Sequence, residues 1–245
     1  MVLYMRKSNL NFLEPSQEQL NNLINYYHTG QYVAVEKLSI VITQEFPEHP
    51  FAWKALAVVL KLTGRLNESL VANQKSAQLN PEDAEIHNNL SITFQELSRF
   101  DESEASCRQA ITLKPDYAEA HYNLGNTLKE LGRLDEAETS YRQAITLKPD
   151  FIKAHNNLSI TLLELDRFDE SEASCRQAIT IKPNFAEAHS NLGNTLKELG
   201  RLDEAETSYR QAITLKPDYA DAYLNLCELL EKTNKVDEAL LVIKN

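Results

Sequence analysis

The chain has fewer basic than acidic residues, and this deficit limits the classes of partner it can bind. The sequence has 25 Lys and Arg residues against 36 Asp and Glu, a net charge of −11. A nucleic-acid partner is not expected, because binding phosphates requires a basic stripe. The same deficit argues against an anionic membrane surface. No apolar run reaches the length of a signal peptide or a bilayer span, so we expect a cytoplasmic protein with no membrane partner.

Cysteine and catalytic motifs are scarce as well. Three cysteines cannot form a disulfide framework, and we interpret them as small core residues in a reducing compartment. The chain has no Gly-rich phosphate loop, no Cys/His metal spacing and no nucleophile elbow. Four histidines recur every 34 residues, which places neighbours about 10 Å apart, too far to share a metal: His87, His121, His155 and His189. We therefore predict no catalytic residue, no metal, no cofactor and no enzymatic activity in this chain by itself.

What the chain does contain is an internal repeat. Residues 118–151, AEAHYNLGNTLKELGRLDEAETSYRQAITLKPDF, return at 186–219 with two changes, Tyr122 to Ser190 and Phe151 to Tyr219. A period near 34 indicates a helical repeat array. We divide the chain into a leader at 1–15 and an array at 16–245, with units 16–49, 50–83, 84–117, 118–151, 152–185, 186–219 and a partial 220–245. A second period of 68 shows that 84–151 was copied as a pair to give 152–219.

Each unit, numbered from 1 to 34, is predicted to be two helices. In the fourth unit one buried face follows helical spacing: His121, Leu124, Gly125 and Leu128. Gly132 suits a left-handed C-cap, and Asp135 with Glu138 resembles a capping box for the second helix. Ser16 with Gln19 is predicted to cap the first helix of the array. Small residues at positions 8 and 20, such as Gly125 and Ala137, let the paired helices approach closely, so that large residues would overpack there.

These residues resemble the tetratricopeptide repeat (TPR) family. The pattern is carried in the second unit by Trp53, Leu56, Ala57, Leu60, Ala77 and Pro81, and in the fourth by Leu124, Gly125, Ala137, Tyr141, Ala144 and Pro149. Departures are His at position 4 of units three to six, and Val35 and Ser39 in the first unit. The resemblance implies an all-α solenoid of about seven antiparallel helix pairs in a right-handed superhelix, whose first helices line a groove that binds peptides or partner proteins.

Asparagine marks the predicted groove face. Positions 2, 6, 9 and 13 lie opposite the buried set on a helix, and position 6 is Asn21, Asn89, Asn123, Asn157, Asn191 and Asn225. Carboxamides can hold a peptide backbone without reading side chains, and no packing reason for these residues is evident from their phase. This ladder is similar to the one in O-linked N-acetylglucosamine transferases. The predicted peptide-binding set is widened by Asn126 and Asn194 at position 9, by Asn88, Asn156 and Tyr122 at position 5, and by Lys129 and Lys197 at position 12. The alternative is a solvated helix face repeated by copying.

Glutamate recurs at positions 2 and 13, which suggests an acidic groove favouring neutral or basic segments. At position 2 the alternative is helix capping, because Glu119 follows Asp116, and Glu187 follows Asn184, at capping-box spacing. TPR domains that clamp chaperone C-termini carry Lys or Arg at positions 2 and 6, and this chain has mostly Glu and Asn there, so we expect no such clamp.

Three functions remain open from the sequence. The first is a protein-interaction scaffold that binds an extended peptide or partner protein in its groove. The second is a substrate-recruiting arm of a larger transferase. The third is a structural solenoid that self-associates through its C-terminal face, where Leu240, Leu241, Val242 and Ile243 replace the polar cap an array needs.

Overall fold

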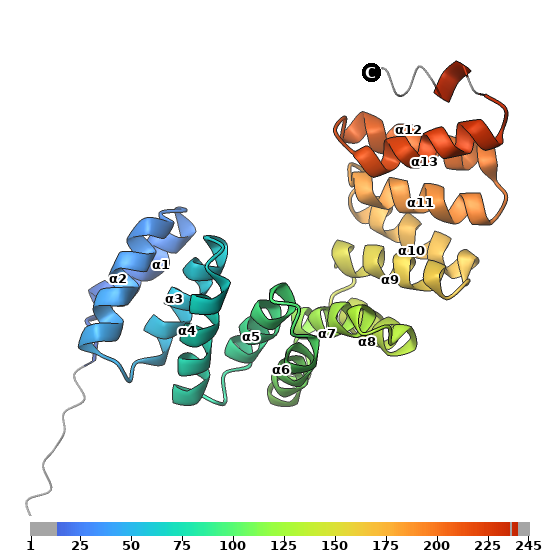
Figure 1. Cartoon of the computed structure of the whole chain (residues 1–245). Coiled ribbons are helices and arrows are strands. Elements are labelled where there is room, and N and C mark those ends of the chain that lie inside the picture. Colours follow the sequence, from blue (N-terminus) through green and yellow to red (C-terminus); the bar gives the residue numbers. More distant parts are fainter. Residues whose placement is uncertain (1–13, 236, 240–245) are drawn as a thin grey trace, which may run out of the picture. The chain divides into compact units, whose positions relative to one another are not determined.

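Every regular element in the described part of the protein is an α-helix. The computed structural model describes residues 14–235 and 237–239, and this part contains thirteen α-helices and no strand (Figure 1). The predicted all-α repeat solenoid is confirmed. The contacts within the chain define two compact parts, residues 1–113 and 114–245. From here on we call these parts unit one and unit two, and we call each 34-residue segment a repeat.

Unit one contains three helix pairs, in which each helix packs on its neighbours in the sequence. Its helices are α1 (Gln17–His28), α2 (Tyr32–Glu45), α3 (Pro50–Leu62), α4 (Leu66–Leu79), α5 (Ala84–Glu96) and α6 (Phe100–Leu113). The first helix begins at a complete capping box, as predicted. The backbone N–H of Gln19 donates to the Ser16 hydroxyl at 3.1 Å, and the N–H of Ser16 donates to the Gln19 side chain at 2.8 Å.

Unit two continues the same alternation. Its helices are α7 (Ala118–Glu130), α8 (Leu134–Leu147), α9 (Ile152–Glu164), α10 (Phe168–Ile181), α11 (Ala186–Glu198), α12 (Leu202–Leu215) and α13 (Ala220–Lys232) (Figure 1). The first helices α7, α9 and α11 each pack against the second helix that follows, and α7, α9, α11 and α13 also contact one another in that order. Their shared face is therefore one continuous surface within unit two, and we call it the first-helix face.

In the turn inside each repeat, the residue at position 15 has a left-handed backbone conformation with positive φ. Gly132 has φ of 73°, as predicted, but Ser98, Asp166 and Asn234 adopt the same conformation with φ of 56°, 57° and 59°. Glycine is therefore not required at this position, although a side chain is strained there. The other glycines at this phase are Gly30, Gly64 and Gly200.

The capping boxes predicted for α7, α8 and α11 are wrong. These helices begin after Tyr117, Arg133 and Phe185, which make no side-chain cap, so the expected acidic partners fall inside the first turn or before the helix. Glu119 instead pairs with Lys148 at 3.1 Å, and Glu187 pairs with Lys216 at 3.6 Å.

The helix–helix contact confirms the need for a small residue at position 8 in the fourth and sixth repeats, whereas the first repeat has the buried Leu23 there. A Cβ atom on Gly125 would lie 2.6 Å from Cε1 of Tyr141, and one on Gly193 would lie 2.5 Å from Tyr209. Tyr141 is fully buried and cannot yield. The third and fifth repeats use another combination at positions 8 and 24, in which Cys replaces the ring and Ser replaces the glycine: Ser91 with Cys107, and Ser159 with Cys175. These cysteines are free and buried.

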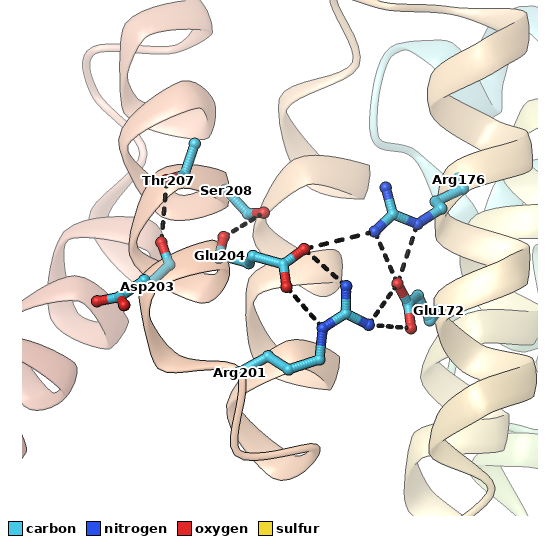
Figure 2. Close-up of polar contacts among 7 residues, drawn as sticks. All are labelled: Glu172, Arg176, Arg201, Asp203, Glu204, Thr207 and Ser208. Carbon is cyan, nitrogen blue, oxygen red and sulfur yellow. Dashed lines mark hydrogen bonds and ion pairs between the residues drawn. The ribbon is translucent and has the colours of Figure 1, made fainter.

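Second helices are joined by guanidinium–carboxylate pairs. Arg201 contacts both oxygens of Glu172, on the preceding second helix, at 2.7 and 2.9 Å, and Glu204 in its own repeat at 2.6 Å (Figure 2). Arg176 approaches both carboxylates, at 2.7 Å from Glu172 and 3.9 Å from Glu204. Burial works against the ionised Glu172, but its hydrogen bonds to Arg176 and Arg201 hold its pKa below the ordinary value.

The same joint recurs along unit two. Arg167 pairs with Glu138 of the preceding second helix, and Lys235 pairs with Glu206 at 2.7 Å. The sequence analysis did not find this feature, although its signal was the recurrence of a basic residue at position 16 with Glu at positions 19 and 21.

Candidate functional site

Predicted groove residues of α7 and α9 are joined by hydrogen bonds on the first-helix face. The Asn157 carboxamide donates to Oδ1 of Asn126 at 2.9 Å and to the hydroxyl of Tyr122 at 3.2 Å. The hydroxyl of Tyr141, on α8, donates to the same Asn126 oxygen at 2.8 Å. Burial raises the pKa of Tyr141, so the hydroxyl stays protonated and remains a donor.

The bonds continue from α9 to α11. Asn156 donates to Oδ1 of Asn157 at 3.3 Å, and Asn191 donates to Oδ1 of Asn156 at 2.9 Å. We call the six joined residues the amide network: Tyr122, Asn126, Tyr141, Asn156, Asn157 and Asn191. The phase of position 6 indicates no packing reason for asparagine, but the carboxamides of Asn157 and Asn191 do link successive first helices in this network.

The pattern changes at the step from α11 to α13. Tyr209 donates to Oδ1 of Asn194 at 2.8 Å, as Tyr141 does to Asn126. Asn225 is the counterpart of Asn157, but its side chain makes no hydrogen bond with the residues that the structure describes. Its two donors and its acceptor therefore remain open at the surface.

Two hollows flank these asparagines, and both are lined by Asn194 and Asn225. The larger has a volume of about 400 Å³ and adjoins the acidic residues Glu164, Asp166 and Glu198. The smaller, about 300 Å³, is lined by Ser190, Asn191, Asn194, Tyr219, Asp221, Leu224 and Asn225. We call it the Ser190 hollow. The open carboxamide of Asn225 lies beside a rim of three acidic residues and one lysine, Lys197, which suits a neutral or basic peptide segment better than an acidic one.

The other predicted site residues have different surroundings. Asn88 and Asn89 lie on α5 in unit one, where Asn88 is buried and Asn89 half-buried. Asn123 is 9% exposed on α7, which leaves little of its carboxamide for a ligand. Lys129 pairs with Glu164 at 3.1 Å and Lys197 with Glu228 at 3.0 Å, so both lysines are tied to the next first helix.

The repeated histidines have a structural contact. Nε2 of His121 donates to the carbonyl of Pro115 at 2.9 Å, and the same bond forms at His87, His155 and His189. Trp53 does the same at position 4 of the second repeat, donating to Pro47 at 2.8 Å. In the second to sixth repeats, position 4 therefore fixes the first helix to the connection before it. In the described part of the chain, no three His, Cys, Asp or Glu side chains group closely enough to hold a metal.

Two further predictions concern the C-terminal face and the crossing of a membrane. The apolar C-terminal face, Leu240 to Ile243, lies outside the described residues. Over residues 14–235 and 237–239, no helix has both the length and the apolar character needed to cross a bilayer.

The chain belongs to the tetratricopeptide repeat family. Family models for the tetratricopeptide repeat match residues 118–151, 152–185 and 174–207, and a TPR repeat model matches 94–132 and 193–234. Together they span 94–234, more than half of the 245 residues. A search of curated proteins gave no match.

Solved structures share the fold. A TPR protein from Parabacteroides merdae ATCC 43184 aligns with a TM-score of 0.73 and 17% identity over 93% of this chain and 90% of its own. The APC/C hetero-tetramer Cut9–Hcn1 aligns with a TM-score of 0.77 and 15% identity, over 86% of this chain and 42% of its own. YrrB, a TPR protein described as having an unusual peptide-binding site, aligns with a TM-score of 0.61 and 19% identity, over 75% of this chain and 95% of its own. At these identities the likeness concerns the fold alone.

Proposed function

We propose that this protein is an interaction scaffold that binds an extended peptide segment along the first-helix face of unit two. The observation that carries the proposal is the pair of hollows around Asn194 and Asn225, where a carboxamide without a partner among the described residues meets open space. A peptide backbone presents alternating donors and acceptors, and a carboxamide can satisfy both.

The amide network supports the same surface in a different way. Asn157 and Asn191 use donors within the protein, so they hold successive first helices in register. A pre-ordered face loses less entropy when a flexible segment binds to it. The acidic residues around the larger hollow favour a segment that is neutral or basic.

The test is a selection of short peptides from a displayed random library, followed by affinity measurements on the purified full chain. We expect Asn225→Ala to weaken the selected peptides about tenfold, the effect of one or two hydrogen bonds. Gln211→Ala is the matched control, because Gln211 is exposed on the second helix α12. It should bind peptides as the unmodified chain does.

Asn225 is a better target than Asn157 or Asn191. Removing either network residue breaks internal bonds as well as any bond to a ligand. Circular dichroism should show the same helicity for Asn225→Ala as for the unmodified chain. Selected peptides that bind Asn225→Ala with undiminished affinity would refute the proposed site.

A further inference from the structure

The two nearly identical repeats differ at one place in the fold. Their two sequence differences are Tyr122 against Ser190 and Phe151 against Tyr219. In the first copy these residues touch, since the rings of Tyr122 and Phe151 lie 4.9 Å apart. The Tyr122 hydroxyl accepts a hydrogen bond from Asn157 at 3.2 Å. The Tyr122 ring therefore fills the space between the two first helices.

In the second copy that ring is missing. Ser190 is 2% exposed, and its short side chain lines the hollow together with Tyr219. The Ser190 hollow, about 300 Å³, lies beside it. Such a volume is at the small end of ligand sites, which suits one side chain better than a cofactor.

The walls of the hollow repeat the surroundings of Tyr122, displaced by 68 residues along the sequence. Tyr219 takes the place of Phe151, whose ring packs against the Tyr122 ring in the first copy. Asn225 takes the place of Asn157, which donates to the Tyr122 hydroxyl. Lys216 lies 4.8 Å from the Tyr219 ring, and Lys148 lies 4.9 Å from the Phe151 ring. Since the lysine in the first copy does not prevent ring packing, the one in the second copy leaves room for it too.

We propose that the Ser190 hollow binds a tyrosine side chain from the partner's extended segment, in the position that Tyr122 fills in the first copy. The inference rests on the proposed function and adds a side-chain preference to it. The ring of the ligand packs on Tyr219, and its hydroxyl accepts the open Asn225 donor. Offset or edge-on contacts between two such rings are favourable.

Two substitutions in the walls strengthen the preference for a neutral ring. Leu224, 68% exposed, replaces the polar Asn156 of the first site and offers apolar area to a ligand. Asp221 is exposed in the lining where the first site has Lys153. Its carboxylate repels a phosphate, so phosphotyrosine should be rejected.

The experiment is an NMR titration of the full chain with two probes. One is 4-methylphenol, the tyrosine side chain alone; the other is a blocked Gly-Ser-Tyr-Ser-Gly peptide, compared with versions carrying phenylalanine or phosphotyrosine. Both probes should shift the side-chain amide signals of Asn225 and Asn194. The phenylalanine peptide should bind about three- to tenfold more weakly, for want of one hydrogen bond, and the phosphotyrosine peptide should cause no shift.

The chain supplies its own matched variant. Ser190→Tyr with Tyr219→Phe installs the residues of the first copy, so it should fold normally, fill the hollow and abolish the shifts. The reciprocal variant, Tyr122→Ser with Phe151→Tyr, should open a second hollow and add shifts at Asn157.

The outcomes separate this inference from the proposed function. If 4-methylphenol leaves Asn225 unshifted, or if the filled variant binds the tyrosine peptide as well as the unmodified chain, the tyrosine site is refuted. Peptides from the random selection would still bind the first-helix face, and the scaffold would stand. If no peptide shifts any signal on that face, both proposals fail.

Discussion

The contact between Gly125 and Tyr141 leads to a sharp test by double substitution. A serine at position 125 brings a Cβ to 2.6 Å from a fully buried ring. Overpacking of this kind should cost about 1–3 kcal/mol of unfolding free energy. Tyr141→Cys alone should cost about 3 kcal/mol, through the cavity and the lost bond to Asn126.

The two substitutions together reproduce the pair Ser159 and Cys175, which the fifth repeat already uses. Cysteine removes the atoms that clash with the serine, so the double variant should lose about 1–2 kcal/mol less than the sum of the singles. Urea unfolding followed by circular dichroism measures each value, provided that the m values agree. The same cycle at Gly193 and Tyr209, where the clash is 2.5 Å, should give a coupling of the same sign. Additive effects at both sites would refute steric coupling.

Three further predictions follow from single residues. Ser98→Gly should stabilise the chain by about 0.5–1 kcal/mol, because glycine relieves the strain of a side chain on a left-handed backbone. A Cβ on Gly132 has no neighbour within 4 Å, so Gly132→Ala should destabilise the chain by backbone strain alone. Urea midpoints measure both effects. Glu172→Gln should lower the melting temperature more at pH 7 than at pH 3. The pKa of Glu172 is lowered in the folded chain, so its contribution is present above the ordinary value of 4.5 and disappears as the pH falls through the folded value. Burial raises the pKa of the Cys175 thiol to about 11, so a thiol reagent at pH 8 should react only after unfolding.

Each of these predictions can be contradicted by a simple result. A destabilised Ser98→Gly would mean that its hydroxyl has a role in the turn that outweighs the backbone strain. An equal loss for Glu172→Gln at both pH values would show that packing, rather than its charge, is what the residue contributes. Rapid modification of Cys175 in the folded chain, traced by peptide mapping, would contradict its burial.

The sequence predicts the fold well because its information is periodic. From the second repeat on, position 8 is small, and the fourth and sixth repeats add a tyrosine at position 24, so Gly125 and Tyr141 identify their contact without coordinates. Helix starts were predicted less well. At Arg133 and Tyr117 the chain enters the helix through local backbone hydrogen bonds without a side-chain cap, so the acidic residues nearby do not mark the boundary.

The candidate site could be predicted only in part. Asparagine at position 6 identifies the face, but the residues at positions 5 and 9 of the preceding repeat decide which amides bond internally. The fourth repeat has Tyr122 and Asn126 at these positions, whereas the fifth has Asn156 and Ile160. Position 6 by itself does not contain this alternation. That Asn225 remains open depends on side-chain directions in three dimensions, which no spacing specifies.

The recurring joint between second helices bears on how the array changed its length. Glu138 meets Arg167, and Glu206 meets Lys235, so the acidic end and the basic end of a 68-residue segment are mutually compatible. Removing 152–219 would place Glu138 opposite Lys235, with the charge pairing kept. A gene segment with self-matching ends can be gained or lost without any second mutation to repair the junction. The surface joints thus make the array modular, while Tyr122 and Ser190 mark a place where the two copied modules now differ.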